Sequence, residues 1–308
     1  MERVLDMLPG LFLLLLLGGL LFYVFLTLYI VWRMLFPPRM TYAWAISRGR
    51  AGEPGELTPP LDNDPWQADT RSGAIDLWDC AGAASRGPVV IFTHGWSDGR
   101  IRMLSRMAPL AQAASRLITW DMPRHGESTL RARFTLAARE HELLIDLIEA
   151  VRARHPDREI VLFGASMGSG LCLAAARGAR VAGIVAEAPY VDPFTPARNA
   201  LLEAGLPSRG ALPVAIGLIG TLSGLGPRWR GFDRAEIASE LTCPILVLHG
   251  DEDPICPLDH GRMIAEASPH SELVVIRGGT HKNLWHDPSH AQRCTEASVR
   301  FLGALRAG

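Results

Sequence analysis

The longest apolar stretch of the chain lies near its N-terminus. From Leu8 to Phe36 the only charged residue is Arg33, and the run from Leu11 to Trp32 holds 22 uncharged, mostly apolar residues. Because a helix rises 1.5 Å per residue, a run of that length spans the roughly 30 Å hydrocarbon core of a bilayer. The pattern therefore predicts a transmembrane helix within residues 1–36.

A cleaved signal peptide is the competing interpretation of this segment. The residues that precede the run, MERVLD, carry no basic excess, and the run is longer than the 7–15 apolar residues usual in signal peptides. We therefore expect an uncleaved anchor. One arginine precedes the run, whereas four follow it, and by the positive-inside rule we expect the catalytic portion on the cytoplasmic side. These four are Arg33, Arg39, Arg48 and Arg50.

Residues 37–65 are rich in residues that interrupt regular structure. They include Pro37, Pro38, Pro54, Pro59, Pro60 and Pro65, with Gly49, Gly52 and Gly55 between them. Such a segment has little capacity for helix or central strand. We expect a linker here, followed by one folded domain over residues 66–308.

Short apolar runs alternate with helical periodicity in the rest of the chain. The segment Thr135–His155 has apolar residues at i, i+3 and i+4 spacing and stops before Pro156, which predicts a helix. Strands alternating with helices predict an α/β fold with a mostly parallel, doubly wound sheet. The expected strands are Ala74–Trp78, Val89–Thr93, Arg116–Trp120, Ile160–Phe163, Val181–Ala186, Ile245–Leu248 and Leu273–Ile276.

Composition excludes several classes of protein. With 31 basic and 32 acidic side chains the net charge is −1, so no basic excess points to nucleic-acid binding. The five cysteines are scattered without a CxxC pair or metal-ligand spacing. Neither a disulfide framework nor a metal site is indicated.

Polar or glycine-rich segments follow directly after five of the expected strands. In open α/β sheets, ligands bind at the carboxyl ends of the strands, so these segments are expected on one functional rim. They are His94–Asp98, Asp121–Ser128, Gly164–Gly168, His249–Asp253 and Gly278–His281.

The segment Gly164-Ala165-Ser166-Met167-Gly168 has the GxSxG pattern of a nucleophile elbow. A sharp strand-to-helix turn there would expose the Ser166 hydroxyl and would need glycine on both sides. A serine hydroxyl is a weak nucleophile until a base and an orienting acid activate it. His281 and Asp253 follow in the chain order nucleophile, acid, base.

Five blocks in order make the sequence resemble the α/β-hydrolase superfamily over about residues 66–308. Within it, the chain is similar to the serine-hydrolase branch of membrane-anchored BEM46-like and FrsA-like hydrolases. The blocks are His94-Gly95-Trp96, Asp121…His125-Gly126-Glu127-Ser128, Gly164–Gly168, His249-Gly250…Asp253…Pro257 and Gly279-Thr280-His281. One departure is Pro123 where an arginine is usual, with Arg124 displaced by one, which puts in doubt a salt bridge beneath the site.

The resemblance implies a hydrolase of a carboxylic ester or thioester that needs no cofactor and no metal. Ser166 would be the nucleophile, His281 the base and Asp253 the acid that orients it. The backbone N–H groups of Trp96 and Met167 would form the oxyanion hole. An acyltransferase with the same residues, an inactive binding module and a peptidase are the alternatives.

Several residues compete for these roles. Asp251 is a second candidate acid, and His286 and His290 are weaker candidates for the base. His94 is expected to brace its loop, His125 and Ser128 to cap a turn, and Cys172 to lie in the core.

About 58 residues separate the strand that ends at Ala186 from Ile245, which is long for an ordinary connection. We expect a lid over about residues 190–240. Its apolar run, Ala211–Gly220, is too short to span a membrane. It could line an acyl pocket, touch the bilayer or simply cover the sheet, and a lipid-like or long-chain ester remains a hypothesis.

Overall fold

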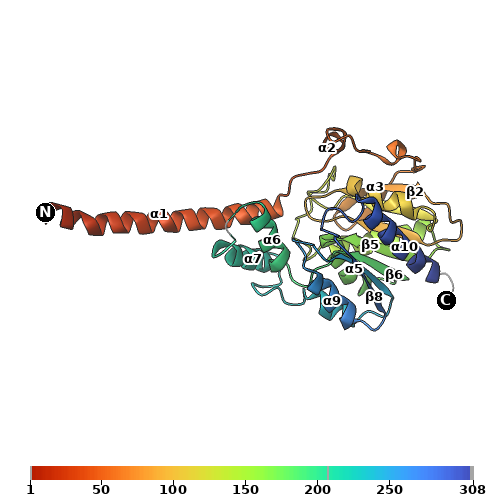
Figure 1. The fold of residues 1–308 in the computed structure, drawn as a ribbon. Coiled ribbons are helices and arrows are strands. Elements are labelled where there is room, and N and C mark those ends of the chain that lie inside the picture. Colours follow the sequence, from red (N-terminus) through yellow and green to blue (C-terminus); the bar gives the residue numbers. More distant parts are fainter. Residues whose placement is uncertain (1, 207, 306–308) are drawn as a thin grey trace.

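A computed structural model of the chain describes residues 2–206 and 208–305. Its centre is an eight-stranded sheet of order β1-β2-β4-β3-β5-β6-β7-β8 (Figure 1). The junctions β1–β2 and β2–β4 are antiparallel and the other five are parallel. The strands are β1 (Trp66–Thr70), β2 (Gly73–Ala81), β3 (Val89–Thr93), β4 (Arg116–Trp120), β5 (Ile160–Ala165), β6 (Gly183–Glu187), β7 (Ile245–Gly250) and β8 (Ser271–Ile276).

Helices cover both faces of the sheet. Buried side chains of α4 (His141–Arg154), α5 (Met167–Ala176) and α8 (Arg234–Ser239) share one core cluster, which α9 (Leu258–Ala267) joins. Those of α3 (Arg100–Leu110) and α10 (Pro288–Ala304) belong to the cluster on the other face. This is the α/β, mostly parallel, doubly wound arrangement that the sequence predicts.

The central strands are buried along their whole length, which explains why their apolar runs are continuous. Every residue of β3, β5 and β7 is buried. Such strands need no polar face, because helices cover both sides of the sheet. β3 and β4 have the bounds expected from the sequence, and the other predicted strands differ at their ends by a few residues.

Two elements differ from the sequence prediction. The edge strand β1 was not expected, because its residues WQADT contain no apolar run. The helix expected from Thr135 begins only at His141. The buried Glu140 carboxylate accepts hydrogen bonds from the N–H and hydroxyl of Thr135, and these bonds hold residues 135–140 in turns.

The N-terminal helix α1 (Glu2–Leu35) projects from the body (Figure 1). Within its segment Gly10–Leu35, a window of 18 residues has a mean hydropathy of 2.7 and is 6% buried, and among the described residues α1 is the one helix long and apolar enough to span a membrane. Its last turns contact the body, where Ile30 and Met34 join the core. Two short helical elements follow, α2 (Tyr42–Ile46) and η1 (Pro54–Glu56).

Three helices lie between β6 and β7. They are α6 (Phe194–Glu203), α7 (Ala211–Leu222) and the already described α8. Figure 1 places α6 and α7 beside the end of α1 that meets the body. The tyrosine hydroxyl of Tyr23 in α1 donates to the carbonyl of Gly210, the residue before α7, at 3.3 Å.

Candidate active site

Ser166 lies at the turn between β5 and α5 with a strained backbone. Its φ is 52° and its ψ is −114°, in a region that side chains rarely occupy. The flanking glycines make the turn possible. A Cβ on Gly164 would lie 2.4 Å from the carbonyl oxygen of Gly168, and one on Gly168 would lie 2.1 Å from that of Thr93. The two glycines of the GxSxG pattern are therefore a steric requirement of this elbow.

Three residues from distant parts of the chain form a hydrogen-bonded series at the carboxyl edge of the sheet. Nε2 of His281 lies 3.1 Å from Oγ of Ser166, and Nδ1 lies 2.7 Å from Oδ2 of Asp253. His281 follows β8 and Asp253 follows β7. The structure thus brings together the nucleophile, acid and base that the sequence suggests.

Asp253 is fixed as an acceptor by its own loop. The backbone N–H groups of Ile255 and Cys256 donate to Oδ1 at 2.9 and 2.8 Å, which leaves Oδ2 to accept from His281. This pairing requires the proton on Nδ1 of His281, so Nε2 faces Ser166 as an acceptor. The geometry is that of a general base.

The surroundings of His281 favour its charged form. Burial alone would lower the pKa of His281, but the Cys256 sulfur, when it is a charged thiolate, and the carboxylate of Asp253 raise it well above its usual value. Burial also raises the pKa of the Cys256 thiol, so this thiol is neutral near pH 7. Asp253 is therefore the group that stabilises the imidazolium.

The contact of Cys256 with the site was not foreseen from the sequence. Its thiol is buried, and the side chains of His281 and Ser166 are close enough to act on its pKa, which they lower while burial raises it. The one hint in the sequence is that Cys256 lies three residues after Asp253. The turn that Asp253 closes with the N–H groups of Ile255 and Cys256 brings this residue back toward the imidazole. Cys172, in contrast, lies in the core as expected.

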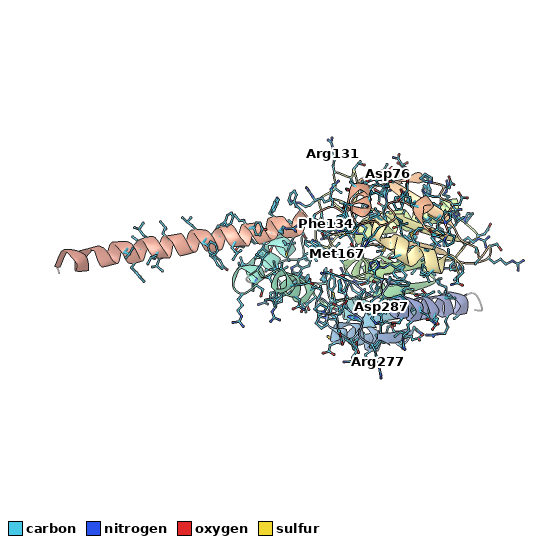
Figure 2. The ribbon with its side chains drawn as sticks, turned by 45° about the horizontal axis from the view of Figure 1, so that its top comes forward. Asp76, Arg131, Phe134, Met167, Arg277 and Asp287 are labelled. Carbon is cyan, nitrogen blue, oxygen red and sulfur yellow. The ribbon has the colours of Figure 1, made fainter. Side chains whose placement is uncertain are left out.

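The two expected oxyanion-hole donors lie on opposite sides of Ser166 in the chain. Met167 is the first residue of α5, and Trp96 is in the loop after β3. Within the described parts of the chain, neither backbone N–H has a hydrogen-bond acceptor. Figure 2 shows Met167 where α1 meets the body. Both N–H groups are thus available to an incoming oxygen.

The side chain of Trp96 links its loop to the end of α1. The indole Nε1–H donates to the carbonyl of Met34 at 3.0 Å, and the guanidinium of Arg33 lies 5.9 Å from the ring centroid. Next to it, the hydroxyl of Ser97 donates to the carbonyl of Pro38 at 3.2 Å. The loop that carries a proposed oxyanion donor is therefore attached to the N-terminal helix and the residues after it.

The histidines of the first two polar segments are structural. Nδ1–H of His94 donates to the carbonyl of Gly95 at 2.8 Å, and its Nε2 accepts from the N–H of Met122 at 3.0 Å. Burial lowers the pKa of His94 to about 4 and that of His125 to about 3, so both rings are neutral. Each holds a loop in place, as expected for His94.

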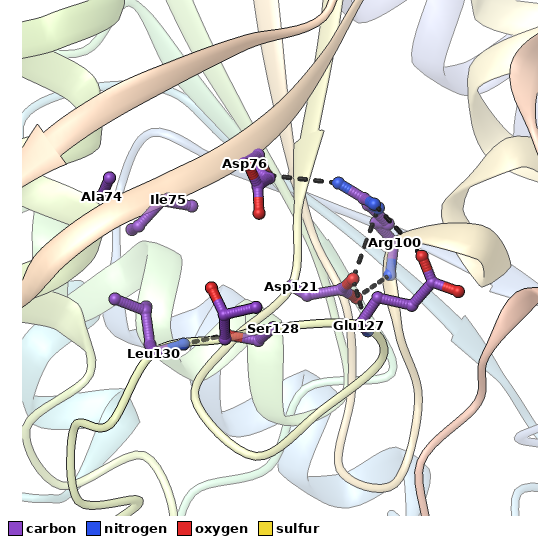
Figure 3. A pocket seen from close by; sticks show the side chains of 9 residues that line it. Ala74, Ile75, Asp76, Arg100, Asp121, Glu127, Ser128 and Leu130 are labelled. Carbon is purple, nitrogen blue, oxygen red and sulfur yellow. Dashed lines mark hydrogen bonds and ion pairs between the residues drawn. The ribbon is translucent and has the colours of Figure 1, made fainter.

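The departure at Pro123 and Arg124 has a structural counterpart. Arg124 does not pair with Asp121; its guanidinium lies 4.1 Å from the ring centroid of Phe36. Arg100 supplies the ion pair instead, with Nε 3.3 Å from Asp121 (Figure 3). Burial raises the pKa of Asp121 to about 6, and its carboxylate accepts from the N–H groups of Arg100 and Glu127.

The competing acid and bases lie outside the hydrogen-bonded series. Asp251 is exposed and accepts from the N–H of Gly278 at 2.7 Å. Nε2 of His286 pairs with Arg102 at 3.0 Å, and His290 lies in α10 near Asp287. None of them is within hydrogen-bond distance of Ser166.

Two cavities lie beside the triad rather than in it. The one in Figure 3, where Arg100 meets Asp121 and Glu127, has a volume of about 10 Å³, which suffices for one water molecule. A second, of about 340 Å³, lies between Met40, Tyr42 and Trp78. Ser166 lines neither. Among the described residues, no cluster of three or more histidine, cysteine, aspartate or glutamate side chains is arranged to hold a metal ion.

Comparison with known proteins identifies the family. Residues 90–297 match the α/β hydrolase family. The chain belongs to this family. Human protein ABHD12B is similar at 25% identity over 228 residues, which cover 67% of this chain and 59% of that protein. The chain thus spans less than two thirds of the length of this relative.

Solved structures of α/β hydrolases share the fold. An esterase from Pyrococcus furiosus superposes with a TM-score of 0.68 at 17% identity, covering 88% of this chain and 98% of the esterase. A thermophilic esterase from Thermogutta terrifontis superposes with a TM-score of 0.57 at 22% identity, covering 80% of this chain and 99% of the other. At these identities the similarity extends to the fold, and the reaction has to be argued from the site.

Proposed function

We propose that this α/β hydrolase is a membrane-anchored serine hydrolase that cleaves a carboxylic ester or thioester. One observation carries the proposal: Ser166, His281 and Asp253 form a continuous hydrogen-bonded series at the carboxyl edge of the sheet, with distances of 3.1 and 2.7 Å. Two backbone N–H groups next to Ser166 have no acceptor among the described residues. Together these are the parts that acyl transfer requires.

The first half of the reaction forms an acyl-enzyme. Oγ of Ser166 attacks the carbonyl carbon while Nε2 of His281 takes the hydroxyl proton. The carbonyl oxygen becomes an oxyanion and accepts from the N–H groups of Trp96 and Met167, each worth on the order of 3 kcal/mol of barrier. The bond to the leaving group then breaks, and His281 returns the proton to the departing alkoxide or thiolate.

The second half releases the acid. A water molecule loses a proton to His281 and attacks the acyl carbon, and the tetrahedral intermediate collapses to a carboxylic acid and free Ser166. The Asp253 carboxylate stabilises the imidazolium in both halves. No cofactor enters any step.

The position of α1 supports a lipid or long-chain acyl substrate. This helix is long and apolar enough to hold the enzyme at a bilayer, and its last turns contact the loop of Trp96. An enzyme held there meets esters that partition into membranes. More arginines follow the apolar run than precede it, which favours a cytoplasmic position for the part of the chain after α1.

Hydrolysis by the full chain in lipid nanodiscs tests the proposal. Rates are measured for p-nitrophenyl esters of 2 to 16 acyl carbons, with Ser166→Ala as the matched variant. We expect turnover that rises with chain length beyond about eight carbons and falls on the order of 10⁴-fold or more in Ser166→Ala. Turnover that survives this substitution would refute the role of Ser166, and equal rates at all chain lengths would refute the long-chain preference.

A further inference from the structure

Helix α7 has apolar residues on two of its sides, and only one of these sides is covered. Leu212, Ala215, Ile216 and Ile219 are buried against the body. On the other face Val214, Leu218 and Leu222, spaced by four residues, are 43%, 41% and 55% exposed. Residues four apart lie on one side of a helix, so these three form a continuous exposed stripe. A helix that only covers the sheet needs apolar residues on its buried side, so this role does not explain the exposed stripe.

This exposure is concentrated around α7. Beyond residue 36, the described residues include seven exposed large hydrophobic side chains, and four of them lie on α6 and α7. The four are Leu202, Val214, Leu218 and Leu222, and the other three are Tyr42 and Ile46 on the short helix α2 and Met263 on α9. Single exposed apolar residues are ordinary, whereas a group of them indicates a contact surface.

The stripe adjoins the exposed apolar surface of α1. Tyr23 contacts Gly210 at the start of α7, and Ile30 and Met34 of α1 share a core cluster with Leu212 and Ile216. On the other side of the same turns of α1, Leu28 and Trp32 are exposed. The two helices therefore lie side by side, and both carry exposed apolar side chains (Figure 1).

The length of α1 sets the depth at which α7 would lie. About 20 helical residues cross a bilayer core of roughly 30 Å. Counted from Leu8, which follows the acidic residue Asp6, these 20 residues end near Thr27. Tyr23 then lies about 6 Å inside the boundary. Interfacial helices insert their apolar face by roughly 5–10 Å, which matches this depth.

Exposed arginines lie at both ends of α7. None of them has a carboxylate within ion-pair distance in the described parts of the chain. Arg133 extends toward the end of the helix, where it donates to the carbonyl of Leu222 at 3.4 Å. The others are Arg209, which precedes the helix, and Arg228 and Arg230, which follow it. Positive charge beside an apolar stripe complements a bilayer that contains anionic phospholipids.

We infer that α7 is a second membrane-contacting element of this enzyme. The stripe of Val214, Leu218 and Leu222 enters the boundary between headgroups and acyl chains, and the arginines at both ends of α7 contact anionic headgroups. The inference rests on the proposed anchoring by α1. It also orients the site: the Trp96 loop contacts the same end of α1, so the catalytic edge faces the bilayer and receives its substrate from it.

A fluorescent reporter in the full chain tests this contact. Cys80, Cys172, Cys256 and Cys294 are buried, so replacing Cys243 with serine leaves an introduced cysteine as the accessible thiol. Leu218→Cys, labelled with an environment-sensitive dye, reports on α7 in vesicles of phosphatidylcholine with phosphatidylserine. Leu17→Cys reports on α1, and Ala304→Cys reports on the opposite end of the molecule (Figure 1).

Nitroxide-labelled lipids distinguish the possible outcomes. We expect quenching of the dye at positions 218 and 17 and none at position 304. Quenching at position 17 without quenching at 218 would overturn the α7 contact and leave the anchor intact. Absence of quenching at both would contradict the anchor itself, and with it the inference.

Activity provides the second measurement. The variant Val214→Gln/Leu218→Gln/Leu222→Gln makes the stripe polar without touching the triad, and Met263→Gln is the matched control on α9. On a long-chain ester dispersed in vesicles we expect at least a tenfold lower rate for the triple variant. Its rate on a short water-soluble ester should stay within twofold. Equal losses on both substrates would indicate a structural role and contradict the inference.

Discussion

At the scale of single residues, the site concentrates strain and charge on a few side chains. Ser166 holds a positive φ of 52°, a conformation that costs on the order of 1–3 kcal/mol and persists because its surroundings enforce it. The glycines at 164 and 168 provide the space. His281 is half-buried and paired with Asp253, so in the proposed mechanism its protonation state decides when Ser166 can react.

The raised pKa of His281 predicts an alkaline shift in activity. The base must be neutral to accept the proton of Ser166, and Asp253 keeps it protonated to higher pH. We expect kcat/KM to rise with pH through an apparent pKa above 6.5, measured with a short water-soluble ester. The apparent pKa of this rise should also stay above 6.5 in Cys256→Ala, because the Cys256 thiol is neutral and the Asp253 carboxylate raises the pKa of His281. An apparent pKa at or below 6.5 in the unsubstituted enzyme would contradict this assignment.

The candidate triad was predictable because each member follows an easily recognised strand. Ser166, Asp253 and His281 come after continuous apolar runs, and parallel strands bring their carboxyl ends to one edge. Cys256 was not predictable in the same way. Its approach to His281 depends on the turn that Asp253 closes through two backbone N–H groups, and no pattern of residue types reveals that turn.

At the scale of elements, α1 is part of the folded body as well as a candidate membrane span. Ile30 is 1% exposed and packs with the core cluster that includes α7. The Trp96 indole and the Ser97 hydroxyl hold the chain just beyond it. Removing residues 1–36 would therefore uncover apolar surface around α7 as well as remove the candidate membrane span.

Truncating Ile30 tests this contact. We expect Ile30→Ala to lower the free energy of unfolding by about 2–5 kcal/mol, because it leaves a cavity between α1 and α7. Leu17→Ala is the matched control, since Leu17 is exposed in the same helix. Thermal unfolding of the full chain in nanodiscs measures both. An equal effect of the two substitutions would show that the last turns of α1 do not stabilise the body.

Sequence patterns predict the central elements better than the peripheral ones. β3 and β4 are specified by their apolar runs, since such strands need contacts on both faces. β1 is an edge strand that pairs with β2 through its backbone, and its side chains carry little signal. Similarly, α4 starts late because the Glu140 carboxylate stabilises turns that helical periodicity does not reveal.

At the scale of the whole molecule, the candidate active site, helices α6 and α7 and the apolar helix α1 lie at one end of the body (Figures 1 and 2). Contacts of Trp96 with Met34 and of Tyr23 with Gly210 join these three parts. The α/β hydrolase fold is shared with esterases at 17% and 22% identity. In this chain a candidate membrane span is attached to the loop beside Ser166.

Reaction with a fluorophosphonate tests the central claim most directly. The probe forms an Oγ–phosphorus bond and loses fluoride only where a serine is activated, and mass spectrometry locates the adduct in the folded full chain. We expect a single adduct on Ser166 that is absent from heat-unfolded protein and strongly reduced in His281→Ala. If circular dichroism verifies that the chain is folded and Ser166 still stays unlabelled, the proposed activation of Ser166 as a nucleophile is contradicted.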